Sequence, residues 1–235
     1  LNNQQGMVVN DELGIIVINE NDIRTRQRFT EAHELMELLF SALPKVPGLI
    51  AQANRFKHRD KERVCNIGAA ELLMPKKAFL SRLNEISFQS AGELSLYFDV
   101  SREAILVRMT EIGFGRHAVV LWKIKNKPTE IEEDVSPYQG SLFENFAPSL
   151  PQKKLRVEWA FCGPNVNYVP LHKSVPEDSS IFQAWKSGKF TASSERLYLG
   201  GEIGLFYCEN QPFKTNSEMM VLSLLHCPGD RCCTL

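Results

Sequence analysis

One stretch of the chain, RFTEAHELMELLF at residues 28–40, combines a histidine and glutamates at a spacing that suits a metal ion. His33 and Glu37 are four residues apart, and side chains four residues apart share one face of a helix. Imidazole and carboxylate groups are both ligands that zinc accepts. The same spacing also occurs on ordinary helix surfaces, so the pair by itself leaves a metal site and a solvated helix face both open.

Glu34 directly follows His33, as in the H-E-x-x-H pattern of zinc hydrolases, where this glutamate takes a proton from metal-bound water. Here the fifth position of the pattern is Glu37 and not histidine. A catalytic zinc also needs a third protein ligand and an open position for water. Glu71 is the candidate, because an unpaired carboxylate would be costly to bury in the apolar segment AAELLMP. A solvent-facing helix residue is the alternative for Glu71.

Hydrophobic spacing predicts the helices that would position these residues. Apolar side chains recur every three or four residues from about residue 27 to 41, which predicts a helix that the prolines and glycine of LPKVPG end. A second helix is predicted in ERVCNIGAAELLM, residues 62–74, and Pro75 suits the first turn of a third. Before them, MVVNDELGIIVINEN predicts a β-hairpin.

Residues 90–114 predict two further short helices around a tight turn at Asp99 to Ser101. Ser101 is a favourable N-cap for the second of them, and the layout is that of a helix-turn-helix. This second helix carries Arg102 and Arg108 but also two glutamates, whereas phosphate contacts need clustered cations. We therefore expect a packing or docking unit, with DNA contact as the alternative.

The remainder of the chain predicts a linker followed by mixed α/β structure. Residues 126–152 are rich in proline and acidic residues, which favours a linker or a long loop. A helix is predicted in SSIFQAWKSG, between Ser179 as N-cap and Gly188 as the stop. Strands are predicted in LRVEWAFC, EIGLFYC and MMVLSLLHC.

Composition narrows the classes of partner and compartment. The chain has 235 residues and a net charge of −1, so no overall basic field favours nucleic acid or a membrane surface. No apolar run approaches the length that spans a bilayer. The first residues lack both a secretory signal pattern and a methionine. We therefore expect a cytoplasmic chain that begins inside a longer gene product, with reduced cysteines.

Three segments together carry a family resemblance: RFTEAHEL, CNIGAAELLMPKKAF and YFDVSREAILVRMTEIGF. They resemble the ImmA/IrrE metallopeptidases, across roughly residues 8 to 114. Members carry arginine–phenylalanine–threonine before A-H-E-L-G-H, then a ligand glutamate in F-A-A-x-L-L-M-P, then V-S-x-x-A-x-x-x-R-L. The C-terminal half resembles the longer, IrrE-like branch, in which a peptidase unit, a helix-turn-helix and a GAF-like domain follow one another.

This resemblance implies an α+β chain in four parts. These are a zincin-like metallopeptidase domain without its N-terminal edge (residues 1–85), a helix-turn-helix (86–125), a linker (126–152) and a GAF-like α/β sensor domain (153–235). The sensor domain would take a small-molecule ligand. The implied activity is zinc-dependent cleavage of an XRE-type transcriptional repressor, which switches on stress-response or mobile-element genes.

Carried over residue by residue, the resemblance makes His33, Glu37 and Glu71 the metal ligands and Glu34 the general base. Met36 stands where the family has glycine, and Glu37 where it has the second histidine. A second carboxylate would make the centre less positive, so the pKa of a bound water would rise and its hydroxide form would become scarcer near pH 7. Such a site also suits manganese better than an imidazole-rich one does. We expect reduced or altered activity; the alternative is an inactive pseudopeptidase that acts by binding.

Three weaker candidates remain. His58, in a basic segment, is either a replacement metal ligand or an exposed histidine. HCPGDRCC, residues 226–233, is either a metal or redox site or a tail with ordinary thiols. Six aromatic residues of the C-terminal half either line a ligand pocket or form the core: Trp159, Phe161, Tyr168, Trp185, Phe206 and Tyr207.

Overall fold

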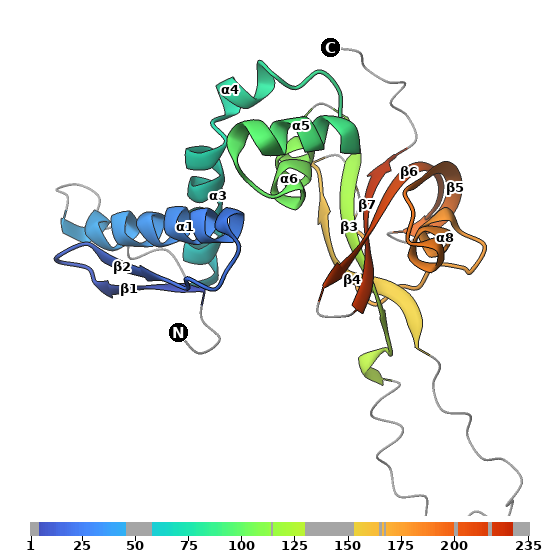
Figure 1. Ribbon diagram of the computed structural model, residues 1–235, viewed down its shortest axis with the longest axis horizontal. Helices are drawn as coiled ribbons and strands as arrows, with labels where there is room; N and C mark the ends of the chain where they lie inside the picture. Colours follow the sequence, from blue (N-terminus) through green and yellow to red (C-terminus); the bar gives the residue numbers. More distant parts are fainter. Residues whose placement is uncertain are drawn as a thin grey trace, which may run out of the picture. The chain divides into compact units, whose positions relative to one another are not determined.

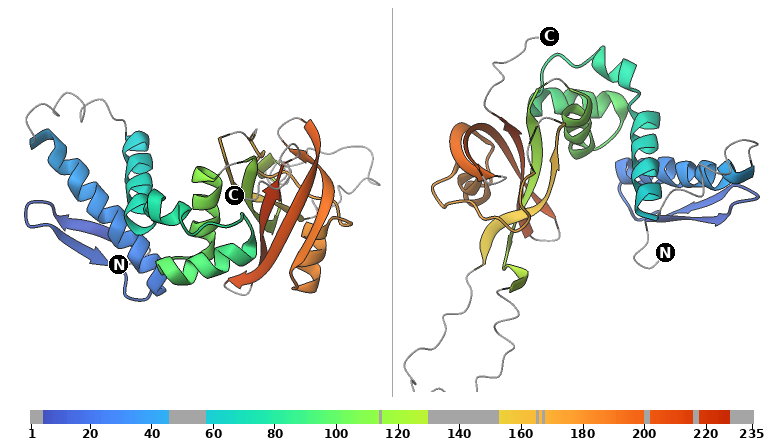
Figure 2. Two further views of the ribbon diagram at one scale, coloured as in Figure 1. Left: turned by 90° about the horizontal axis from the view of Figure 1, so that it is seen from above. Right: turned by 180° about the vertical axis from the view of Figure 1, so that it is seen from behind.

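The computed structural model divides the chain into two compact units, one within residues 1–113 and one within residues 114–234. Figures 1 and 2 follow the helices and strands of each unit along the chain. Both helices and β-sheet are present, so the α+β prediction is confirmed. The structure describes residues 5–45, 58–113, 115–129, 153–164, 166, 168–199, 202–215 and 218–227.

The first unit opens with the predicted hairpin, in which β1 (Gly6–Asn10) pairs antiparallel with β2 (Ile15–Ile18). Both strands contact the helix that follows them, and Figure 1 shows this helix lying along the hairpin. Gly6 makes the contact possible, because a β carbon at this position would collide with the side-chain methyl of Thr30. The close approach brings the backbone of β1 onto the helix that carries His33.

Two long helices form the body of this unit. α1 (Arg24–Ala42) begins three residues before the predicted start and continues into a short 3-10 turn, η1 (Leu43–Lys45). α3 (His58–Leu73) packs against α1. The buried face of α3 includes Cys65 and Ala69, both 0% exposed. Such small side chains suit a close contact between the two helices.

Three shorter helices complete the unit: α4 (Lys76–Leu80), α5 (Phe88–Phe98) and α6 (Arg102–Ile112). Ser101 caps α6 as predicted, since its side chain accepts a hydrogen bond from the Ala104 amide. The turn before it places Asp99 at φ 52, in the left-handed region. Arg28 of α1 donates to the Asp99 carboxylate at 2.7 Å and to its carbonyl at 3.1 Å. The α5–α6 turn is thereby tied to α1.

The division of the chain differs from the predicted one at the helix-turn-helix. α5 and α6 lie in the same compact unit as α1 and α3, and no break between units falls at residue 85. The predicted segment 86–125 also contains a strand, β3 (His117–Lys125), which belongs to the second unit. Sheet pairing with strands far along the chain decides this membership. The predicted linker is described only up to residue 129, and the rest of it lies outside the described residues.

The second unit is a five-stranded antiparallel sheet in the order β4-β3-β7-β6-β5. Strands β4 (Lys154–Cys162), β6 (Glu202–Thr215) and β7 (Glu218–His226) contain the three predicted ones. β3 and β5 (Thr191–Leu199) were not predicted. Helix α8 (Ser180–Ser187) has the predicted Ser179 and Gly188 at its ends, and it packs on β5, β6 and β7.

The core of the second unit lies between the sheet and α8. Trp122, Ile181 and Ala184 are each 0% exposed and belong to one cluster of buried apolar residues. A buried polar chain crosses the strands beside it: Trp122 Nε1 donates to Ser223 Oγ at 2.9 Å, and Ser223 Oγ donates to Asn210 Oδ1 at 2.6 Å. Because each of these polar groups has a partner, Trp122 is held in one orientation.

No helix in the described part of the chain combines the length and the hydrophobicity needed to cross a membrane.

Candidate active site

His33 lies on α1 with both ring nitrogens turned toward α3. Its Nδ1 is 3.0 Å from Asn66 Oδ1, and its Nε2 is 3.6 Å from Glu62 Oε2. An amide oxygen can only accept, so this contact places a proton on Nδ1. In the neutral imidazole, Nε2 then carries a lone pair. That lone pair faces a carboxylate, an arrangement that favours a cation between the two groups.

Glu37 lies one turn after His33 and is already paired with a cation. Lys61 of α3 places its Nζ 2.5 Å from Glu37 Oε1. Both side chains are mostly covered, with 28% and 25% of their surfaces exposed. The hydrogen bond to Glu37 raises the pKa of Lys61, so the ammonium stays charged. At the position where the family pattern has a second histidine, this chain therefore has an ion pair between α1 and α3.

Glu34 is the buried carboxylate of the cluster, at 8% exposure. Burial raises its pKa, and the neighbouring charge of Glu37 raises it further. The Val8 amide of β1 donates a hydrogen bond to this carboxylate, which is why the close approach at Gly6 matters here. Among the described residues, Glu34 Oε2 has no hydrogen-bond partner. A buried carboxylate with a raised pKa and a free oxygen is suited to take up a proton.

Glu71, the predicted third ligand, has different partners. Its carboxylate accepts hydrogen bonds from the Lys76 amide, at 2.9 Å, and from the guanidinium of Arg108 in α6. The Lys76 hydrogen bond and Arg108 hold the pKa of Glu71 below its usual value. Arg108 is 3% exposed and also contacts Glu111 at 2.9 Å. Glu71 thus joins α3 to α6. Its side chain is 53% exposed, which agrees with the solvent-facing alternative and not with a carboxylate buried among apolar groups.

The predicted trio of His33, Glu37 and Glu71 is therefore not brought together. No group of three histidine, cysteine or acidic side chains in the described part of the chain is arranged closely enough to hold a metal ion. The reason is rotation about α3: Glu62 and Glu71 are nine positions apart, which at about 100° per residue puts them about 180° apart around the helix. Only the face with Glu62 meets His33.

Glu62 is the residue that sequence reasoning missed. The signal available was its spacing of four from Asn66, which puts both side chains on one face of α3. These two residues contact the two nitrogens of the His33 ring. By donor type, His33 and Glu62 suit zinc, and Glu37 would complete the set if Lys61 released it. The donor types of His33, Glu62 and Glu37 suit a divalent metal, with Lys61 as a competing cation. In the described arrangement these three side chains, too, are not close enough together to hold an ion.

Two departures from the family pattern meet each other in space. Met36 replaces the pattern's glycine, and Gly68 stands where the F-A-A-x-L-L-M-P pattern has phenylalanine. A β carbon at Gly68 would lie 2.5 Å from Met36 Sδ, so the methionine occupies the space that a side chain at position 68 would need. The large and small residues have changed places across the α1–α3 contact, which preserves the packing volume.

The structure places the three weaker candidates differently. His58 is the first residue of α3, and its side chain lies outside the described part. Cys227 is a core residue at 5% exposure, whereas Cys232 and Cys233 lie outside the described residues. None of the six predicted aromatic residues lines the cavity found in the second unit. Phe206 is in the core and Trp185 packs against it, while Tyr168 and Tyr207 are exposed.

Comparison with known proteins supports the resemblance for the first unit. Residues 2–110 match the Peptidase_M78 family model, described as the IrrE N-terminal-like domain. The match extends into α6, so it includes α5 and most of α6 together with α1 and α3. It supports the ImmA/IrrE family and a metallopeptidase-like function for this part of the chain. A search of curated proteins found no significant match.

Proposed function

We propose that the first unit is a zincin-like metallopeptidase domain that cleaves an XRE-type transcriptional repressor and so switches on stress-response or mobile-element genes. The observation that carries this proposal is the contact between His33 Nε2 and Glu62 Oε2, beside the buried carboxylate of Glu34. His33 and Glu62 would hold zinc or manganese, with Glu37 as the third ligand after Lys61 leaves it. The match of residues 2–110 to a peptidase family supports the metallopeptidase part of this proposal.

Each residue of the cluster has a task in this proposal. Asn66 Oδ1 accepts a hydrogen bond from His33 Nδ1–H and thereby keeps the Nε2 lone pair directed at the metal position. When bound, the metal would polarise the scissile carbonyl and acidify a water. Glu34 would take the proton of that water, because burial has raised its pKa toward the range of a general base. The second carboxylate in the set predicts slower turnover than a two-histidine site.

Zinc content of the purified chain, measured by mass spectrometry after exposure to zinc and buffer exchange, tests the ligand set. We expect about one ion per chain, lost in His33→Ala and in Glu62→Gln and retained in Glu71→Gln, the matched control on the same helix. Cleavage of a co-expressed XRE-type repressor should likewise be lost in His33→Ala and Glu62→Gln and retained in Glu71→Gln. It should also be abolished in Glu34→Gln. Zinc that stays in Glu62→Gln and leaves in Glu71→Gln would reverse our assignment.

A second candidate function is binding without cleavage, as a pseudopeptidase. The Lys61–Glu37 ion pair favours it, because an ammonium group already supplies the positive charge that a metal would bring. In that case the chain would hold the repressor with the same affinity after Glu34→Gln, and no product would form with either protein. Product formed by the unaltered chain, but not by Glu34→Gln, would exclude this candidate.

The finer domain assignments are part of this proposal. α5 and α6, with the capped turn between them, would be a helix-turn-helix used for docking and not for DNA, because the guanidinium of Arg108 is buried against Glu71 and Glu111. The antiparallel sheet with α8 on one face is compatible with a GAF-like domain that senses a small molecule. The cytoplasm is the compartment in which a repressor would be met.

A further inference from the structure

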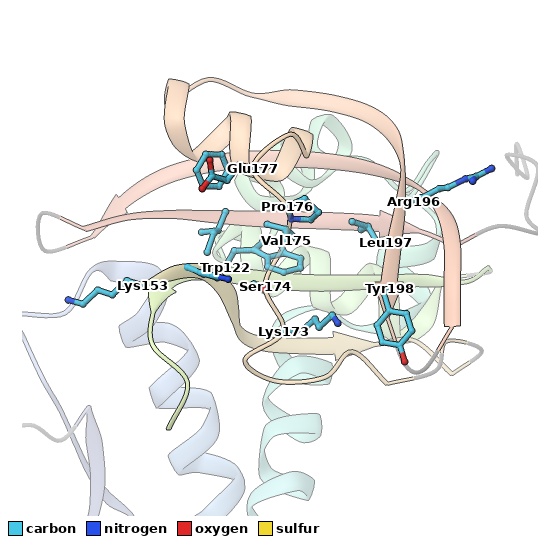
Figure 3. A pocket seen from close by; sticks show the side chains of 13 residues that line it. Trp122, Lys153, Lys173, Ser174, Val175, Pro176, Glu177, Arg196, Leu197 and Tyr198 are labelled. Carbon is cyan, nitrogen blue, oxygen red and sulfur yellow. The ribbon is translucent and has the colours of Figure 1, made fainter. Parts of the chain in front are cut away.

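A cavity of about 660 Å³ lies in the second unit, beside the buried core (Figure 3). Its walls come from β3, the start of β4, the segment 173–177, α8 and β5. This volume is within the range of about 300–1,000 Å³ that is usual for small-molecule sites.

The floor of the cavity is apolar and rigid. It is lined by three residues of the core: Trp122 (0% exposed), Leu155 (1%) and Leu197 (4%). The hydrogen bond from Trp122 Nε1 to Ser223 fixes the indole ring. Phe182 of α8 adds a second aromatic side chain. The apolar character of this lining suits the flat apolar part of a ligand.

One wall is held in place by backbone hydrogen bonds. The segment 172–175 runs along β4: the Val157 amide donates to the Lys173 carbonyl at 2.9 Å, and the Val175 amide donates to the Leu155 carbonyl at 3.2 Å. Arg156 adds a donor to the His172 carbonyl at 3.1 Å. The position of Lys173 is thus set by β4, and this side of the cavity is preformed.

The rim of the cavity is cationic. Four cationic side chains line it: Lys153, Lys154, Lys173 and Arg196. Among the described lining residues, Glu177 is the single acid. Within the described residues, none of these four cations forms an ion pair with a carboxylate; Lys173 instead lies over the ring of Tyr198, 4.3 Å from its centre. In Figure 3, Lys153 and Arg196 extend outward at opposite ends, with Lys173 between them. Clustered cations beside a surface of low polarity attract anions.

We propose that this cavity binds a small aromatic anion, whose ring packs on the floor beside Trp122 and whose carboxylate or phosphate group faces Lys173 and Lys154 at the rim. The apolar floor accounts for the ring, and the four cations at the rim account for the negative charge. The site differs from the pocket that the sequence predicted, because it uses Trp122, Phe182 and Tyr198. It does not depend on the peptidase activity proposed for the first unit.

Isothermal titration calorimetry on the full chain tests the proposal with two matched probe pairs: adenosine monophosphate against adenosine, and 2-naphthoate against 2-naphthamide. We expect at least one anion to bind about tenfold or more tightly than its neutral partner, and to weaken as salt is raised. The pair that responds identifies phosphate or carboxylate as the preferred group. Equal affinity within both pairs, or no binding of any probe at millimolar concentration, overturns the proposal.

A charge-matched pair of variants locates the site. Lys154→Glu with Lys173→Glu reverses two rim cations, whereas Lys186→Glu with Lys189→Glu makes the same change of net charge at exposed positions outside the cavity. We expect the rim variant to lose about tenfold or more in affinity and the control to lose less than about twofold. An equal loss in both would mean that overall charge attracts the anion, and the cavity would have no part in it. Thermal unfolding of both variants verifies that each is folded.

Discussion

Lys61 and Glu37 join α3 to α1 through an ion pair, with Nζ 2.5 Å from Oε1. Glu37 occupies the position where the family pattern has a metal-binding histidine. In the metal site that we propose, a divalent ion would have to compete with the Lys61 ammonium for this carboxylate. The ion pair would then decide whether Glu37 can act as a ligand.

Replacing Lys61 with methionine should increase the affinity for zinc. The substitution keeps an unbranched side chain that is one atom shorter, removes the positive charge and releases Glu37 from its ion pair. We expect the dissociation constant for zinc, measured by competition with a chelator, to fall by about tenfold or more. Lys61→Arg retains the cation and serves as the control, with little change. If Lys61→Met binds zinc no more tightly than Lys61→Arg, the competition does not exist.

Glu71→Gln should destabilise the first unit without affecting a metal. The substitution leaves the buried guanidinium of Arg108 with a neutral partner, although Glu111 still pairs with it. A hydrogen bond to a charged group contributes roughly 1.5–3 kcal/mol, and the half-exposed position of Glu71 places the loss in the free energy of unfolding near the low end, about 1–2 kcal/mol. Urea unfolding measures this loss, and an unchanged midpoint would contradict it.

The loss of stability caused by Glu71→Gln should depend on pH. The pKa of Glu71 is lower in the folded protein, chiefly through the Lys76 amide and then through Arg108. Its contribution to stability is therefore present above the unfolded-state pKa, near 4.5, and disappears as the pH falls through the folded-state pKa. The difference between the unaltered chain and Glu71→Gln should shrink on acidification below about pH 4.5. A difference that stays constant down to pH 3 would speak against this origin.

Glu34→Gln should stabilise the first unit at neutral pH, whereas Glu71→Gln should destabilise it. The folded-state pKa of Glu34 is raised, mainly by burial, so ionised Glu34 opposes folding above its unfolded-state pKa. We expect the free energy of unfolding of Glu34→Gln to exceed that of the unaltered chain near pH 7, with the gain vanishing toward pH 4. Circular dichroism melts at the two pH values provide the measurement. A variant that is less stable at pH 7 would show that the carboxylate supports the fold.

Met36 and Gly68 should behave as a coupled pair. Gly68→Ala introduces a β carbon 2.5 Å from Met36 Sδ, and relieving that overlap should cost about 1–3 kcal/mol of stability. Combining it with Met36→Ala should remove much of this loss, because alanine lacks both Sδ and Cγ, the two atoms that lie 2.5 and 2.8 Å from the added β carbon. A double-mutant cycle by urea unfolding measures the coupling. Additive effects of the two substitutions would mean that they do not share this space.

Local sequence determined many of the helices and strands of this protein, although β3 and β5 were not predicted. The hairpin, the helices α1 and α3, and the capping of α6 by Ser101 and of α8 by Ser179 follow from interactions within a few residues, so spacing and residue type predict them. The four-residue spacing of His33 and Glu37 likewise places them on one face of α1 wherever that helix lies.

Tertiary structure decided which face of each element meets which partner. Spacing cannot tell whether Glu62 or Glu71 turns toward His33, because both lie on α3 and the rotation of that helix is set by its contact with α1, including Met36 over Gly68. Strand β3 joins the second unit through pairing with β4 and β7, residues far away in sequence. The cationic rim around Trp122 also arises only when β3, β4, β5 and the segment 173–177 converge. Such long-range contacts leave no periodic signal in the chain, so only the folded protein reveals them.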